Sequence, residues 1–327
     1  MTTKSKIASI VLGIIIALIA SLCIFIFATK KDVSFMARFV ELYLRVGWER
    51  AFKSAEEAQV YMKNIDNNTA LKPPKLKSKL SEELILKNTV YVFNEAEKSD
   101  TAIVFLHGGG YVAEPSLFHW KFADKLSRET TLPLYLPIYK KAPAHHYDEA
   151  YTFLSEFWKS LKAKGIKRIF LMGDSAGGGL SLGFTQFCIK ESLTIPAALI
   201  LLSPWLDLSM SNPDIPKYIS IDPMLSLPGL IEMGRAWAGG ADVSNYKLSP
   251  INGSLKGLPP ILFFVGTHEI FLADSQRFKK LAETAGVNLR YIEAAGMNHD
   301  FPLFPIPEAK EAFSLIVQYI ADIKDRK

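Results

Sequence analysis

A serine between glycines, in the sequence GDSAGG, is the first feature of this 327-residue chain that could carry chemistry. Ser175 follows the apolar run at 169–172 and precedes a helix-like segment. In a G-x-S-x-G turn the glycines allow a sharp strand-to-helix bend that exposes the serine hydroxyl, and the helix N-terminus favours developing negative charge. A glycine-rich turn with a helix-capping serine would have the same local sequence. The hexapeptide alone therefore leaves a nucleophile and a capping residue as alternatives.

A second glycine-rich segment, HGGG at 107–110, follows the apolar run AIVFL. Glycines after a buried strand leave backbone N–H groups open to a substrate oxygen. Such loops form an oxyanion hole together with the N–H of the residue after the nucleophile, here Ala176. The loss of one such donor costs about 2.7–4 kcal/mol of transition-state stabilisation. The two motifs together favour a nucleophilic Ser175 over a capping serine or a flexible glycine hinge.

A serine hydroxyl is a weak nucleophile unless a base takes its proton, and histidine is the natural base. In parallel sheets that carry a G-x-S-x-G turn, the catalytic residues follow one another along the chain in the order serine, acid, histidine. Only His268 and His299 follow Ser175. His299 comes after the last predicted strand, in GMNHDF, so its loop can return to the cleft. We therefore predict His299 as the base, with a solvated loop histidine as the alternative.

The acid that orients this histidine is expected just past a strand end. Glu269 meets this condition, because it follows the apolar run 261–265 and Gly266. Asp274 is a rival, but it is predicted to lie within the next helix. Asp300 adjoins the histidine in sequence and is poorly placed to bind its far nitrogen. His107 is predicted to organise the glycine loop.

Strands and helices that could position these residues alternate along the chain. This alternation indicates a mainly parallel, doubly wound sheet covered on both faces, in which ligands bind beyond the carboxyl ends of the strands. Residues 205–246 lack the alternation and are predicted to be an insertion over that edge. Strands are predicted at 83–86, 89–93, 102–106, 134–138, 167–172, 197–202, 261–265 and 289–293, and helices within 32–70 and at 118–128, 148–164, after 175, at 274–285 and at 308–324.

These motifs resemble the hormone-sensitive-lipase-like family of α/β-hydrolase esterases over roughly residues 85–320. The resemblance is carried by HGGGY at 107–111, GDSAGG at 173–178, G-x-x-acid at 266–269 and H-x-F at 299–301. YKKAPAHHYDEAY at 139–151 is also similar to the Y-x-x-A-P block of that family.

The resemblance implies an α/β-hydrolase fold and a carboxylic-ester hydrolase that needs no cofactor. It implies a catalytic triad of Ser175, Glu269 and His299, with Gly109, Gly110 and Ala176 as oxyanion donors. It also implies a helical cap, here about 32–75 and 205–247. Two positions depart from the family pattern: the acid is Glu where Asp is commoner, and Ala144 replaces the usual Glu after A-P.

The predicted reaction is a two-step acyl transfer on short- to medium-chain acyl or acetyl esters. Tyr111, Trp205 and Phe301 are candidates to line the substrate pocket, and core positions are the alternative for each. The same triad could cleave an amide, as in a deacetylase or formamidase. A non-catalytic ligand receptor on the same fold would usually lack a triad member, and a membrane-bound scaffold has no coiled-coil or low-complexity segment to support it.

Residues 7–27 contain no charge and are flanked by Lys4 and Lys6 before and by Lys30 and Lys31 after. This length spans a bilayer as a helix, so we predict a membrane anchor at 1–31 followed by the hydrolase domain at 32–327. A cleaved signal peptide is the alternative, although no clear A-x-A site follows. The short basic N-terminus favours an orientation with the hydrolase domain on the extracytoplasmic side.

The net charge of +5 comes from lysines and arginines scattered among acids, which does not favour nucleic-acid binding. The two cysteines, Cys23 and Cys188, have no metal-binding spacing. The predicted partners are therefore a small-molecule ester and, through residues 7–27, the lipid bilayer.

Overall fold

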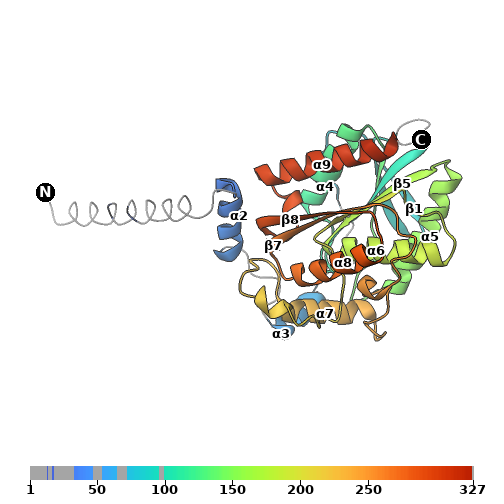
Figure 1. Ribbon diagram of the computed structural model, residues 1–327. Coiled ribbons are helices and arrows are strands. Elements are labelled where there is room, and N and C mark those ends of the chain that lie inside the picture. The colour runs from blue at the N-terminus through green and yellow to red at the C-terminus, as the bar shows by residue number, and fades with distance from the viewer. Residues whose placement is uncertain are drawn as a thin grey trace.

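A computed structural model describes residues 13, 17, 33–46, 54–64, 72–95 and 99–325 (Figure 1). The predicted anchor at 7–27 lies outside these residues, apart from two isolated positions. Within the described residues, no helix is both long and apolar enough to cross a membrane.

Within the described chain, eight strands form one sheet in the order β1-β2-β4-β3-β5-β6-β7-β8. The pairs β1–β2 and β2–β4 are antiparallel, and every later pairing is parallel. The mainly parallel sheet predicted from the sequence is therefore confirmed. The strands are β1 (Leu80–Ile85), β2 (Asn88–Phe93), β3 (Thr101–Leu106), β4 (Leu134–Pro137), β5 (Arg168–Asp174), β6 (Ala198–Leu202), β7 (Ile261–His268) and β8 (Leu289–Asn298).

Helices cover both faces of the sheet, as Figure 1 shows. One face packs against α5, α6 and α8, and the other against α4 and α9. The central strands β3, β5 and β6 are buried along nearly their whole length because neither face meets water. The helices are α2 (Phe35–Val46), α3 (Ala55–Asn64), α4 (Leu117–Thr130), α5 (Tyr147–Ala163), α6 (Ser175–Lys190), α7 (Leu227–Ala238), α8 (Leu272–Thr284) and α9 (Pro307–Lys324), with short 3₁₀ turns η1 (Ile215–Lys217), η2 (Pro250–Asn252) and η3 (Phe301–Leu303).

The predicted helical region at 32–70 contains two separate helices with different neighbours. α3 packs against α7 of the 205–247 insertion, and Gln59 Nε2 donates a hydrogen bond to Glu232 Oε2 at 2.9 Å. α2 instead meets the start of α9, where Ser34 N donates to Glu308 Oε1 at 2.6 Å. The two segments predicted to form a cap thus contact each other through α3 and α7, and also through Arg45 of α2, which donates to the backbone carbonyl of Ile221.

Candidate active site

Ser175 lies at the junction of β5 and α6, with a left-handed backbone (φ +49°). This conformation is uncommon for a residue with a side chain, and it persists only where the surroundings hold it. Gly177 provides part of that support, because a Cβ atom there would overlap the backbone carbonyl of Leu106 at the end of β3. The glycine therefore lets the turn at Ser175 pack directly against the strand that leads into HGGG.

The HGGG loop is hydrogen-bonded to the residue before Ser175 and packs against the insertion. Gly108 N donates to Asp174 Oδ1 at 3.0 Å, and a Cβ on Gly108 would overlap that carboxylate. Gly109 and Gly110 have positive φ values of +108° and +63°. A Cβ on Gly110 would come 2.6 Å from Met233 Sδ of α7. The loop is thereby held in a conformation that only glycine adopts readily.

Ala176 is the second residue of α6, in the first turn, where backbone N–H groups have no partner within the helix. The structure thus brings the predicted donors Gly109, Gly110 and Ala176 to one edge of the sheet, at the ends of the neighbouring strands β3 and β5. The loop is supported from behind by Tyr139, whose hydroxyl donates to the carbonyl of His107 at 2.7 Å.

His299 and Glu269 form a fully buried pair, with 2.8 Å between His299 Nδ1 and Glu269 Oε2. The other carboxylate oxygen, Oε1, accepts hydrogen bonds from Ser203 Oγ (2.7 Å) and Gly266 N (2.6 Å). Both oxygens of the acid are therefore occupied, and its orientation is determined by three donors. This is the arrangement in which a carboxylate holds an imidazole in one tautomer and stabilises its protonated form.

Asp300 contacts the other nitrogen of the histidine, which sequence reasoning did not anticipate. Its Oδ2 lies 3.1 Å from His299 Nε2, the nitrogen that would have to receive the proton of Ser175. The backbone explains this placement, because Asp300 is left-handed (φ +54°) and its N–H donates to Ser203 Oγ at 3.1 Å. Ser175 Oγ makes no hydrogen bond to the residues that the structure describes. Catalytic hydrogen bonds often form only in the substrate complex.

Burial and the two carboxylates act in opposite directions on His299. Burial lowers the pKa of the imidazole, but attraction to Asp300 and hydrogen bonding to Glu269 outweigh it, so the pKa lies well above its usual range. Burial also raises the pKa of Asp300 to about 7, against the attraction of His299. The pKa values of His299 and Asp300 are therefore both raised above those of the free side chains.

Asp174 and His119 form a second buried pair that the sequence analysis missed. His119 Nε2 lies 2.9 Å from Asp174 Oδ2, and His119 Nδ1 accepts a hydrogen bond from Ser116 N at 2.9 Å. Asp174 precedes the nucleophile within the GDSAGG motif, so its position at a strand end was a signal that could have been used. His119 lies inside α4 and carries no comparable signal.

Asp222, in the insertion, is a further buried acid that was not predicted. Its carboxylate accepts backbone hydrogen bonds from Met224, Leu225 and Ile270, the last at 2.8 Å. Burial raises the pKa of Asp222 to about 6 despite these donors. Because Ile270 follows Glu269, Asp222 fastens the acid-bearing loop to the insertion.

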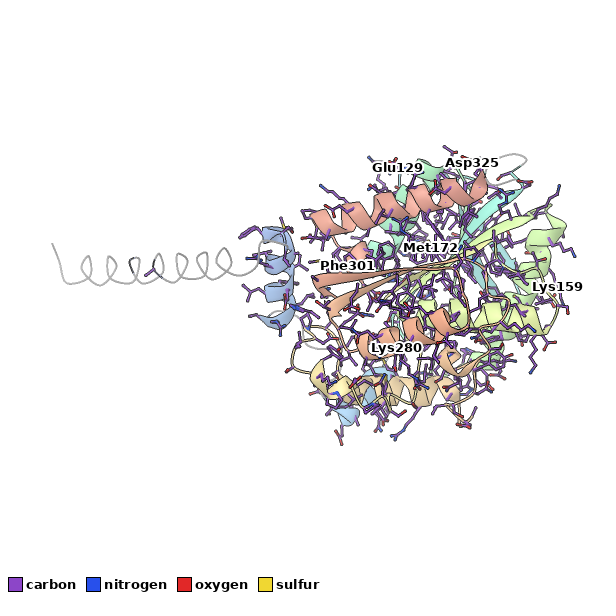
Figure 2. All side chains as sticks on the ribbon, viewed as in Figure 1. Glu129, Lys159, Met172, Lys280, Phe301 and Asp325 are labelled. Carbon is purple, nitrogen blue, oxygen red and sulfur yellow. The ribbon has the colours of Figure 1, made fainter. Side chains whose placement is uncertain are left out.

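The three pocket candidates are all buried. Tyr111 stacks against Trp237 and Trp205, with ring centroids 4.6 and 5.7 Å apart. Trp205 N donates to the carbonyl of Ser175 at 2.8 Å, so this residue supports the nucleophile turn directly. Phe301 lies beyond the end of β8 and is labelled at that edge in Figure 2. Their contact with substrate stays a prediction.

Comparison with known proteins agrees with this arrangement. A family model described as alpha/beta hydrolase fold matches residues 103–303. An esterase from Acinetobacter venetianus is 31% identical over 236 residues, which cover 70% of this chain and 78% of the esterase. An acetyl-hydrolase from Streptomyces hygroscopicus is 26% identical over 224 residues, covering 67% and 75% of the two chains.

Solved structures extend the match. A Staphylococcus aureus protein assigned as an esterase has a TM-score of 0.81 and 30% identity, covering 88% of this chain and 99% of its own. An esterase of the bacterial hormone-sensitive lipase family has a TM-score of 0.76 and covers 88% and 97%; at 23% identity it supports the fold alone. The chain belongs to the α/β-hydrolase-fold family, and the resemblance to hormone-sensitive-lipase-like esterases is confirmed. It is a serine hydrolase of the carboxylesterase and lipase class.

Proposed function

We propose that this enzyme hydrolyses carboxylic esters through an acyl-enzyme on Ser175, with His299 as the base and Glu269 as the residue that orients it. The observation that carries the proposal is the joint placement of three elements at one sheet edge. These are the strained Ser175 turn, the HGGG loop packed against it, and the buried His299–Glu269 pair.

In the first step His299 Nε2 accepts the proton of Ser175, and Oγ attacks the ester carbonyl carbon. The N–H groups of Gly109, Gly110 and Ala176 stabilise the oxyanion, and the alcohol leaves with the proton held by His299. A water molecule, deprotonated at the same nitrogen, then releases the carboxylic acid and restores Ser175. Asp300 must give up Nε2 before the first transfer, since one imidazole nitrogen cannot accept a proton while it donates to a carboxylate.

The proposed substrates are esters with acetyl or short- to medium-chain acyl groups. The relative named as an acetyl-hydrolase supports this choice. Amide cleavage by the same residues is tested directly by a matched anilide of the preferred acyl group.

Ser175→Ala tests the nucleophile. The wild-type chain should react with a fluorophosphonate probe at Ser175, as read by mass spectrometry of the labelled peptide, and should hydrolyse p-nitrophenyl esters. The variant should lose both properties and retain the wild-type circular dichroism spectrum. Retained ester hydrolysis in the folded variant would refute the assignment of Ser175.

We also propose that residues 7–27 anchor the enzyme in a membrane, with the hydrolase domain on the extracytoplasmic side. The 21 uncharged residues between flanking lysines support the anchor. The full chain should then remain in the membrane fraction after an alkaline carbonate wash, and protease added outside the intact cell should digest the hydrolase domain. Release by carbonate would contradict the anchor, and protection from protease would contradict the sidedness.

A further inference from the structure

Helix α2 carries apolar residues on two opposite faces. The inward face buries Ala37 and Leu44. One apolar face is sufficient to attach a surface helix to its domain, and an exposed apolar patch usually marks a contact with something else. The outward face consists of five side chains that are between 44% and 80% exposed: Phe35, Met36, Phe39, Tyr43 and Val46. At 3.6 residues per turn, these five positions fall within about 100° of the helix circumference.

Polar contacts attach α2 to the edge of the sheet that bears the active site. Glu41 Oε1 lies 3.1 Å from His268 Nδ1, in the residue before the predicted acid. Arg45 donates to the backbone carbonyl of Ile221, next to Asp222 of the insertion. Figure 1 shows α2 beside the ends of β7 and β8. The exposed apolar face is therefore on the side of the molecule where the strands end and Ser175 and His299 lie.

Further exposed apolar side chains begin α4, which starts at the same edge after the HGGG loop. Leu117 and Phe118 are 49% and 41% exposed. Phe118 contacts Phe304, with ring centroids 5.5 Å apart, and Phe304 precedes the start of α9 that binds Ser34. Exposed apolar residues thus occur at two places along this edge.

We infer that the outward face of α2 lies in the interface of a lipid bilayer and turns the active-site edge toward the membrane. The inference rests on the proposed anchor. Lys31 and Phe35 are four residue steps apart, which span at most about 14 Å when fully extended. A membrane span that ends before Lys30 and Lys31 thus keeps α2 close to headgroup depth. A helix with Phe, Met and Tyr on one face is suited to that depth.

This orientation also defines the substrate class. An active-site edge facing the bilayer receives esters that are dissolved in the membrane, whereas an edge facing away would receive water-soluble ones. The predicted substrate is therefore an acyl ester that partitions into lipid and enters the site without crossing the aqueous phase.

The depth of α2 can be measured on the full chain in vesicles of phosphatidylcholine and phosphatidylglycerol. In a Cys23→Ser background, Phe39→Cys is labelled with an environment-sensitive nitrobenzoxadiazole fluorophore and exposed to doxyl-lipid quenchers. Lys159→Cys is the matched control, because Lys159 is on the far side of the molecule from α2 (Figure 2) and its side chain is 61% exposed. The fluorophore at 39 should be blue-shifted and quenched, and the fluorophore at 159 should be neither.

Flotation of the same samples separates the inference from the anchor. Protein that floats with the vesicles but is not quenched at 39 retains the anchor and overturns the interfacial α2. Protein that does not float overturns both. A blue shift at 39 that depends on protein concentration and not on the quencher would assign this face to a second copy of the chain, and would also overturn the inference.

A kinetic test uses the full-chain double variant Phe39→Glu/Tyr43→Glu, with Lys159→Glu as control. Two buried carboxylates in the interface should reduce turnover of a long-chain ester held in vesicles by about ten-fold or more. Turnover of water-soluble p-nitrophenyl acetate should stay within about two-fold, since α2 contributes no group to the triad. If the double variant changed the turnover of both substrates by the same factor, or changed neither, the result would contradict a role for this face in lipid contact.

Discussion

Two buried histidine–carboxylate pairs lie at the same edge of the sheet, and they differ in what their second nitrogen does. In the His299–Glu269 pair the separation is 2.8 Å, and in the His119–Asp174 pair it is 2.9 Å. Burial lowers the pKa of both histidines, and the neighbouring carboxylates more than offset it, so both pKa values are raised. Distance, burial and the direction of the pKa shift therefore do not distinguish them.

The surrounding hydrogen bonds do distinguish the two pairs. His119 uses Nδ1 to accept from Ser116 N and Nε2 to contact Asp174, so neither nitrogen is available to a substrate. His299 is held by Glu269 through Nδ1 only, and its Nε2 contacts the carboxylate of the adjacent residue, Asp300. The comparison teaches that two buried pairs of similar geometry are distinguished by the partner of the second nitrogen, a backbone N–H for His119 and the adjacent carboxylate for His299.

The largest expected difference between the pairs is in turnover. His299→Gln should lower kcat by about 10⁴-fold or more, because it removes the group that accepts the proton of Ser175. His119→Gln should lower kcat far less and instead reduce the free energy of unfolding by about 1–3 kcal/mol, since it removes the imidazole donor from the buried carboxylate of Asp174. Steady-state kinetics and urea unfolding measure the two effects. Similar losses of kcat in both variants would remove the distinction.

The two acids provide the next comparison. Glu269→Gln should reduce kcat by about 10⁴-fold, because the amide cannot stabilise the imidazolium and can select the wrong tautomer. Asp174→Asn keeps an oxygen for Gly108 N but weakens the link to His119, so kcat should fall by at most about 10²–10³-fold, as for an impaired oxyanion donor. Both values come from kcat on the same p-nitrophenyl ester. A larger loss of kcat for Asp174→Asn would mean that the His119–Asp174 pair takes part in proton transfer.

Asp300→Asn tests the carboxylate that contacts Nε2 of His299. The base must be neutral to act, and Asp300 raises the pKa of His299, so wild-type activity should decline with falling pH already above the ordinary range of histidine. Removing the charge lowers that pKa, and the acid limb of the kcat/KM profile should therefore move to lower pH. Glu269 and Asp222 also face His299, and both are unchanged in this variant, so a shift of the acid limb can be assigned to Asp300. An unmoved acid limb would show that Asp300 does not influence the base.

The smallest expected effect concerns Ser203, whose hydroxyl donates to Glu269 and accepts from Asp300 N. Ser203→Ala should reduce the free energy of unfolding by about 1–3 kcal/mol and lower kcat by less than about ten-fold, because Gly266 N still holds Glu269. Ser127→Ala is a matched control, since its buried hydroxyl donates to Leu132 O at 2.7 Å away from the triad. The control should lose stability and keep kcat, and a loss of kcat in the control alone would contradict the role assigned to Ser203.

Much of the fold could be predicted because its signals are local. Continuous apolar runs such as 102–106 and 261–265 indicate strands buried on both faces, and each is a strand in the structure. The helical region at 32–70 was less predictable. Its amphipathic pattern indicates helix, but the different neighbours of α2 and α3 depend on contacts with α9 and α7, far away in sequence.

The sequence by itself determined the elements of the site: two glycine-rich turns after buried strands, and an acid and a histidine following later strands in the required order. Glycine spacing and strand ends are local properties, and the carboxyl ends of parallel strands necessarily meet at one edge. Only the tertiary structure decided the hydrogen-bond partners. Asp174 faces His119 from the extended end of β5, and Asp300 faces Nε2 of His299 from a left-handed backbone that Ser203 holds. Such directions depend on neighbours that are remote in the chain, so no spacing in the sequence encodes them.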